Sequence, residues 1–192
     1  PGRARAAGAA AVLAFWAGLT ARRAQVWSDS RSLWEATAAC AAGNPRADAG
    51  LAVLRAGQNR RPEARELLRR ALSVAPDHAG ALFNLALLDF EDGAPVPAEA
   101  ALAAFEAAHP PGDARLATLR GKIAEEKGRL SDAAGHYRRA AALDPLYALP
   151  RRNLGLLLAR AGRAAEARPE LEAALRLDPA DAELRDFLAA SP

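Results

Sequence analysis

The sequence repeats itself with a period of 34 residues. Leu-Asp-Pro occupies positions 143–145 and again positions 177–179. Counting back 34 residues from Pro145 reaches Pro111, and counting back 34 from its neighbour Pro110 reaches Pro76. Between successive prolines, apolar residues recur at the three- and four-residue spacing of two short amphipathic helices. One short helix pair cannot bury its apolar face alone, so this period predicts an array of stacked helix pairs.

Small residues recur at fixed positions within each period. If the proline of Leu-Asp-Pro is position 32, the small positions are 8, 20 and 27. They hold Gly121, Ala133 and Ala140 in one period and Gly155, Ala167 and Ala174 in the next. Two antiparallel helices approach closely only where the side chains between them are small. These positions therefore mark the predicted contacts between the two helices of each pair.

The turn between the two helices of a pair has its own signature. Position 15 holds residues that readily adopt the left-handed conformation that ends many helices, namely Gly93, Gly128, Gly162 and, in the first period, Asn59. Ser131, at position 18, is expected to cap the second helix of the third period. The proline at position 32 should stop each second helix.

Together these features resemble the tetratricopeptide repeat (TPR) family, whose repeat is 34 residues long. The resemblance covers about residues 46–181 and implies an all-α fold, a right-handed α-solenoid of about four helix pairs. The predicted repeats are residues 46–78, 79–112, 114–147 and 148–181, and residues 182–192 are expected to form a C-terminal capping helix.

The first repeat departs from the TPR pattern. It has Asp48 and Arg55 at positions 4 and 11, where large apolar residues are usual. We interpret it as a degenerate terminal repeat, which is common at the ends of such arrays.

The second repeat poses a conflict of register. Its prolines keep the period, but the regular register would place Phe105 at the small position 27. We therefore predict a shift of three residues, which puts Ala101, Phe105 and Ala108 at the contact positions. The shift requires a lengthened turn at residues 94–97 and a shortened loop before Pro110.

Residues 6–21 are uncharged and have arginines on both sides. As a helix they would span about 24 Å, less than the roughly 30 Å hydrocarbon core of a bilayer. The flanking arginines can extend the effective length by reaching toward the lipid headgroups. We favour a transmembrane helix within residues 1–25, with a signal peptide or an alanine-rich soluble helix as alternatives. The arginines at both ends leave its orientation open.

Residues 26–45 are expected to form a junction helix. Ser32 and Glu35 have the spacing of a capping box, so the helix should begin at Ser32 and run to about Ala42, where Gly-Asn-Pro at 43–45 stops it. With Trp27, Asp29 and Trp34, this block resembles the junction in polytopic transmembrane-and-TPR membrane proteins such as the O-mannosyltransferases. The resemblance implies that the array lies on the non-cytoplasmic side of the membrane. Because the chain begins at Pro1 without a methionine, we expect it to be part of a longer protein.

Composition gives no sign of catalysis in the visible chain. Its 26 basic and 23 acidic residues are intermixed, and its arginine pairs have no aromatic residues between them, so no nucleic-acid partner is expected. Cys40 and the three histidines (His78, His109 and His136) lack the mutual spacing of a catalytic or metal site. We therefore expect a non-catalytic chain with no cofactor and no metal.

The resemblance implies that the array binds a protein or peptide. In TPR proteins the first helices of successive repeats line a concave groove, which here would consist of Phe83, Asn84, Leu87, Phe90, Leu119, Lys122, Arg152, Asn153, Leu156 and Arg160. Asn84 and Asn153 share position 6, where a side-chain amide can both donate to and accept from an extended peptide backbone. Alternatively, Phe83, Leu87 and Leu156 pack between repeats and contact no ligand.

We expect the ligand to be an apolar peptide or helix against Phe83 and Phe90, with acidic character favoured by Arg152 and Arg160. The predicted function is a membrane-tethered, extracytoplasmic protein-interaction module, the tail of a larger membrane protein. One alternative is a part of a membrane glycosyltransferase that presents substrates to it. Another is a soluble or periplasmic TPR adaptor.

The uncharged segment gives a first testable prediction. A polypeptide that begins at Pro1 should partition into membranes or detergent, whereas one that begins at Val26 should stay in the aqueous phase and remain helical. Phase separation in detergent and circular dichroism would measure both properties. Equal aqueous solubility of the two polypeptides would contradict the membrane interpretation.

Overall fold

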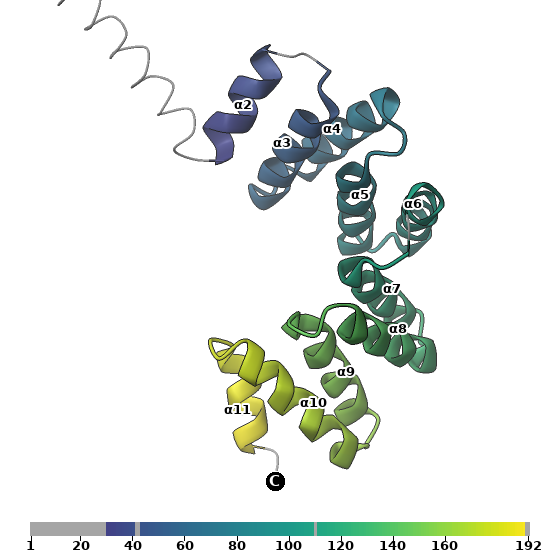
Figure 1. The fold of residues 1–192 in the computed structure, drawn as a ribbon, viewed down its shortest axis with the longest axis vertical. Helices are drawn as coiled ribbons and strands as arrows, with labels where there is room; N and C mark the ends of the chain where they lie inside the picture. The colour runs from purple at the N-terminus through teal and green to yellow at the C-terminus, as the bar shows by residue number, and fades with distance from the viewer. Residues whose placement is uncertain (1–29, 41–42, 110, 191–192) are drawn as a thin grey trace, which may run out of the picture. The chain divides into compact units, whose positions relative to one another are not determined.

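The structure of the protein, a computed structural model, describes residues 30–40, 43–109 and 111–190 (Figure 1). Within these ranges all regular elements are helices. In chain order they are α2 (Ser30–Cys40), α3 (Pro45–Gly57), α4 (Arg61–Val74), α5 (Ala79–Glu91), α6 (Pro95–Ala108), α7 (Ala114–Glu126), α8 (Leu130–Leu143), α9 (Ala148–Arg160), α10 (Ala164–Leu177) and α11 (Ala182–Ala190). The all-α prediction is confirmed for this part of the chain.

The chain divides into two compact units between Leu88 and Asp89, and each is described by itself. The first unit contains α2, α3, α4 and most of α5. The second contains the end of α5 and the helices α6 to α11. Helices of 13 and 14 residues alternate from α3 to α10, as expected for repeated helix pairs.

The second helix of every pair buries its fourth, eighth and eleventh residues. The fourth is always alanine, and the eighth is leucine or tyrosine. The buried sets are Ala64, Leu68 and Ala71; Ala98, Leu102 and Phe105; Ala133, Tyr137 and Ala140; and Ala167, Leu171 and Ala174. The four sets coincide with no shift between repeats, so a single register applies throughout the array.

This register corrects the prediction for the second repeat. Helix α6 begins at Pro95, after a three-residue turn as short as the others, so residues 94–97 form no lengthened turn. Phe105 does occupy the position that is alanine in the other repeats, and Ala108 is exposed. The connection to the next repeat is longer by one residue, at 109–113, than the four-residue connections at 75–78 and 144–147. The added residue gives room for the large side chain of Phe105. The predicted shift would have kept Phe105 out of the small position 27.

Close approach between paired helices depends on glycine in the second unit. A Cβ at Gly121 would lie 2.6 Å from Cδ1 of the buried Tyr137 ring. A Cβ at Gly155 would lie 2.5 Å from Cγ of Leu171 and 3.2 Å from the carbonyl oxygen of Ala167. The predicted contact between positions 8 and 20 is therefore present. The side chain at position 24, Tyr137 or Leu171, packs directly against each glycine.

The turns within the pairs follow the prediction. Asn59, Gly93, Gly128 and Gly162 have φ angles of 59°, 70°, 74° and 74°, all in the left-handed region. Ser131 does not cap its helix. Helix α8 begins at Leu130, its cap residue is Arg129, and no side chain caps it. The turn leaves only three residues between the two helices, so the second helix starts earlier than a cap at Ser131 would allow.

Helix α2 packs on α3 through an aromatic contact. The indole of Trp34 lies against Gly50, where a Cβ would be 2.9 Å from Cγ of the indole. The helix already includes Ser30, so Ser32 lies within it and is not its cap, contrary to the capping-box prediction. The predicted end of this helix at Ala42 lies outside the described residues.

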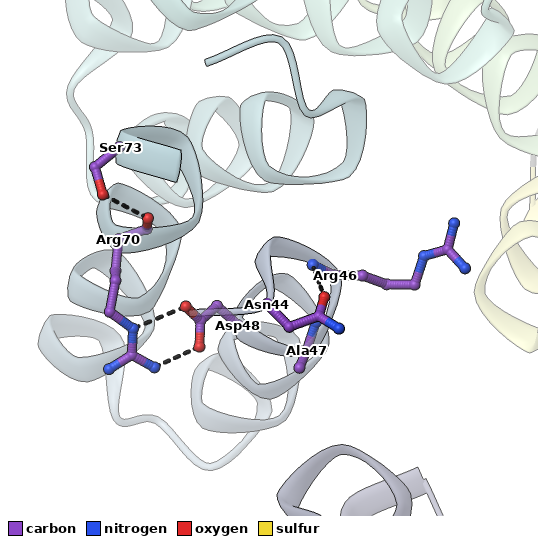
Figure 2. Close-up of polar contacts among 6 residues, drawn as sticks. All are labelled: Asn44, Arg46, Ala47, Asp48, Arg70 and Ser73. Carbon is purple, nitrogen blue, oxygen red and sulfur yellow. Dashed lines mark hydrogen bonds and ion pairs between the residues drawn. The ribbon is translucent and has the colours of Figure 1, made fainter. Parts of the chain in front are cut away.

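Polar residues of the first repeat are satisfied inside the first unit (Figure 2). Asn44 caps α3 by accepting from the backbone N–H groups of Arg46, at 3.0 Å, and Ala47, at 3.4 Å. The buried carboxylate of Asp48 accepts two hydrogen bonds from Arg70 on α4, one of them from Nε at 2.8 Å. This contact raises the pKa of Arg70. An ion pair therefore replaces the apolar residue that occupies position 4 in the second and third repeats, Leu82 and Ala117. Arg151, at position 4 of the fourth repeat, also pairs with a carboxylate, that of Glu170.

Helix α6 is joined to α7 by several charged side chains. Arg120 donates from Nε and Nη2 to the carboxylate of Glu106, at 2.8 and 2.6 Å. Lys127 and Arg129 both pair with Glu99, at 2.5 and 3.1 Å, and the contact with Lys127 lowers the pKa of Glu99. The backbones of α6 and α7 approach each other less extensively than those of α8 and α9, so ion pairs are prominent at this junction.

No helix in the described ranges is both long and apolar enough to cross a membrane. The predicted transmembrane helix falls within residues 1–25, which lie outside those ranges, and it stays a prediction.

The Asp48–Arg70 pair gives a prediction about stability. Arg70→Met should lower the free energy of unfolding by about 1–3 kcal/mol, because it leaves a buried carboxylate without its partner. The double variant Asp48→Leu/Arg70→Met should recover most of that loss, since position 4 then holds an apolar residue, as in the second and third repeats. Urea unfolding measures both.

Arg69→Met provides the control, because Arg69 is the exposed neighbour of Arg70 on the same helix. It should change the free energy of unfolding by less than about 0.5 kcal/mol. A double variant that is as unstable as Arg70→Met would show that the carboxylate is not the source of the loss.

Candidate functional site

In the second unit, α7 and α9 are the first helices of successive repeats and carry most of the predicted groove. Arg160 of α9 donates to Glu125 of α7 at 2.5 Å, which ties the two helices together. Glu125 also accepts at 2.8 Å from the hydroxyl of Tyr137 on α8. Burial, and then this contact with Glu125, raise the pKa of Tyr137, so the phenol stays protonated. One carboxylate thus connects three helices.

Two residues at groove positions on α7 belong to the core. Leu119 and Thr118 are each 3% exposed, and the Thr118 hydroxyl donates to the carbonyl oxygen of Ala114 at 2.7 Å. Leu119 therefore offers no surface to a ligand. The asparagines that share its position in the second and fourth repeats, Asn84 and Asn153, are only half-buried.

Arg152 is paired within the array. Its Nε lies 2.8 Å from Asp181 Oδ2, an ion pair that lacks the geometry of a hydrogen bond, and its Nη2 donates at 2.9 Å to Glu183 of α11. Together with the Arg160–Glu125 pair, these contacts compensate both arginines that were expected to select an acidic ligand. Their carboxylate partners lie about a full repeat away in the sequence, and no local pattern identifies them.

Leu156 also has a structural role. It packs, partly buried, against a cluster formed by Leu171, Ala174 and Leu184. This contact connects α9 with α10, its partner in the fourth repeat, and with α11.

Lys122 and Asn153 differ from these residues. Lys122 is half-buried on α7 and forms no ion pair with any residue that the structure describes. The side-chain Nδ2 of Asn153 is buried on α9 and has no hydrogen-bond partner among the described residues. A buried donor that lacks an acceptor is unfavourable by about 1–3 kcal/mol. These two side chains are the polar groups of the predicted groove in this unit that remain available to a ligand.

The remaining predicted residues lie on α5. Phe83, Asn84 and Leu87 belong to the first unit, and Phe90 belongs to the second. All four are half-buried. Phe83 and Phe90 are seven residues apart, which places them on one side of the helix.

The sequence matches two family models, both described as tetratricopeptide repeat, over residues 55–123 and 118–182. Residues 55–182 are therefore tetratricopeptide repeats, and the chain belongs to this family. A comparison with curated proteins finds no match.

Solved structures with the same fold include several TPR proteins. PilF of Pseudomonas aeruginosa is 24% identical with a TM-score of 0.69, over 76% of this chain and 66% of that one. TTC0263 of Thermus thermophilus, a thermophilic TPR protein, is 25% identical with a TM-score of 0.65, over 76% of this chain and 79% of that one. YrrB, described as a TPR protein with an unusual peptide-binding site, is 18% identical with a TM-score of 0.61, over 90% of this chain and 88% of that one.

Tetratricopeptide repeats, the family that both models match, typically serve protein interaction and are not typically catalytic. Within the described residues, no cluster of three or more histidine, cysteine or carboxylate side chains could hold a metal ion. Cys40 is exposed and is not in a disulfide.

The groove residues make a prediction that separates packing from binding. Leu156→Ala should lower the free energy of unfolding by about 1–2 kcal/mol, below the range for a fully buried leucine, because the side chain is only partly covered. Lys122→Ala should change it by less than about 0.5 kcal/mol. Thermal unfolding of both variants measures the difference. Equal losses would contradict this assignment of roles.

Proposed function

We propose that the array binds an extended peptide along the face of α7 and α9 that carries Lys122 and Asn153. The observation that carries the proposal is the buried Nδ2 of Asn153, which has no acceptor among the described residues. A backbone carbonyl of a peptide would supply that acceptor after a small rotation of the amide. The ligand thereby gains the hydrogen bond that the unliganded array does not make.

Lys122 complements this contact. Its ammonium group has three donors and no carboxylate partner among the described residues. It lies on the first helix of the preceding repeat, so an extended peptide that reaches Asn153 would pass it. YrrB, of the same fold, is described as having a peptide-binding site, which supports a peptide as the ligand class.

Preference for an acidic ligand is weaker than the sequence indicates. Arg152 and Arg160 are compensated by Asp181, Glu183 and Glu125, which leaves Lys122 as the uncompensated cation of this face. We expect the array to recognise the peptide through its backbone and through one carboxylate near Lys122, from a side chain or from the C-terminus. Phe83, Asn84, Leu87 and Phe90 remain proposed contacts on α5.

The proposed setting is a membrane-tethered array on the non-cytoplasmic side. Its support is the sequence of residues 6–21, which are uncharged between arginines. A second candidate function, presentation of substrates to a membrane glycosyltransferase, is favoured only by the resemblance of residues 26–45 to such proteins. Activity of the full-length gene product on glycosyl donors, lost when residues 46–192 are deleted, would support the second candidate.

Selection from a random displayed library of peptides about 12 residues long, or about 40 Å when extended, tests the peptide-binding function. Calorimetry with a selected peptide should show that Asn153→Leu weakens binding by about tenfold. This is the effect expected when one hydrogen bond between uncharged groups is lost. Lys122→Gln should weaken it as well.

Arg138→Gln is the control, because Arg138 is an exposed arginine on α8 and lies outside the proposed face. It should leave the affinity within about twofold. If Asn153→Leu and Lys122→Gln both bind the selected peptides as tightly as the unmodified protein, the proposed face is wrong.

A further inference from the structure

A depression of about 520 Å³ opens where α6 ends, between α7 and α8 of the second unit. Its apolar walls are Phe105 of α6, Leu116 of α7 and Leu143 of α8. A neighbouring depression of about 700 Å³ shares Phe105 and Leu143 and extends to Tyr147. We call the two together the α6–α8 depression. It is large enough for one or two side chains of a bound peptide.

The α6–α8 depression is separate from the proposed peptide-binding face. Leu116, Ala117 and Arg120 contribute to it from one side of α7. Lys122 follows Arg120 by two residues, which corresponds to about 160° around a helix with 3.6 residues per turn. A ligand in the depression and a ligand at Lys122 would therefore contact opposite sides of α7.

The depression lies where the junction between α6 and α7 is irregular. The other repeats have alanine at the position of Phe105 and a connection of four residues to the next helix. Here the phenylalanine ring stacks obliquely on His109, with ring centroids 4.8 Å apart. Because the connection at 109–113 has five residues, α7 begins one residue later than the 34-residue period predicts.

Charges around the depression are compensated with two exceptions, Arg139 and Asp144. The carboxylate of Asp144 accepts from the backbone N–H of Leu146 at 3.0 Å and forms no ion pair with any described residue. Arg120 is bound by Glu106 through two hydrogen bonds. Asp113 accepts from Arg115 at 2.8 Å and caps α7, and these contacts lower its pKa. Arg139 is exposed and has no hydrogen bond or ion pair with any of the described residues. The depression thus combines apolar walls with one unpaired guanidinium, beside Leu143 in its first part, and one unpaired carboxylate in its second part.

His136 lies beside this guanidinium in the lining of the depression. Burial is the main cause that lowers its pKa, and the charges of Arg120, Arg139 and Arg129 lower it further, against the opposing effect of Asp132. The imidazole is therefore neutral at pH 7 and still has one N–H to donate. A carboxylate beside Arg139 could accept from both side chains.

We propose that the α6–α8 depression is a second peptide-binding site, which takes a segment with one large apolar side chain next to a carboxylate. The apolar side chain enters between Phe105, Leu116 and Leu143. The carboxylate pairs with Arg139, and His136 donates to it. Charge complementarity selects this ligand, because Arg139 is the cation of the lining that lacks a carboxylate among the described residues. Basic or uncharged apolar peptides would leave that charge unpaired.

A short designed peptide tests the site on the intact chain. The probe is the acetylated and amidated pentapeptide Gly-Asp-Trp-Glu-Gly, and its matched control is Gly-Asn-Trp-Gln-Gly, which has the same shape without the charges. Titration followed by nuclear magnetic resonance should show the probe binding with perturbed His136 and Leu143 signals. The pKa of His136 should rise when the probe is bound, since a nearby carboxylate favours the protonated ring.

Neighbouring arginines on α8 supply the matched variants. Arg139→Gln should weaken the probe about tenfold, as expected for a lost charge-assisted contact. Arg138→Gln removes an equally exposed arginine that does not line the depression and should change the affinity less than about twofold. Asn153→Leu should also leave it unchanged, which distinguishes this site from the face on α7 and α9.

Any one of four results would overturn the proposal. The first is no binding of the probe at about 1 mM, the weak limit of specific recognition. The second is equal affinity for the probe and its uncharged control. The third is an equal effect of Arg138→Gln and Arg139→Gln. Binding that is lost in Asn153→Leu and kept in Arg139→Gln would instead assign the probe to the other face, and would likewise reject a site in the depression.

Discussion

The close approach of two helices at a residue without a side chain is the contact on which the array depends. In the third repeat, Gly121 lets the ring of Tyr137 lie directly on the backbone of α7. In the fourth, Gly155 does the same for Leu171. Alanine at positions 20 and 27 of these repeats keeps the two helices close over the rest of each interface. Since an alanine-rich core buries little apolar area per residue, close packing over many short helix pairs must provide the stability.

One candidate site and one ion pair with a buried carboxylate arise where the array departs from this pattern. Asp48 replaces an apolar residue in the first repeat and is compensated by Arg70 from the paired helix. Phe105 replaces alanine in the second repeat, and the space beside it becomes the α6–α8 depression. At the other candidate site, Asn153 has a buried donor without an acceptor among the described residues. A regular array would have neither the ion pair nor the depression, because each lies at a residue that the repeat itself does not require.

Period and local backbone conformation were predictable from sequence because they depend on residues close together in the chain. The left-handed turns at Asn59 and the three glycines are an example. The predicted register of α6 is wrong, since the volume of Phe105 was considered without the longer connection that accommodates it. The partners of Arg152 and Arg160 were missed because ion pairs that span about a full repeat have no local pattern. Leu119 shows that a groove position can be buried by its own repeat.

Two glycines of the third repeat test most directly whether close approach at position 8 holds the array together. Gly121→Ala should lower the free energy of unfolding, although alanine favours a helix over glycine by about 1 kcal/mol, because the added Cβ collides with the Tyr137 ring. Gly135→Ala meets no atom within 4 Å and should raise it by about 0.5–1 kcal/mol. Urea unfolding of the two variants should therefore give shifts of opposite sign. If both variants were stabilised, the helices would not be in contact at Gly121, and close approach at position 8 would not be what holds the pairs together.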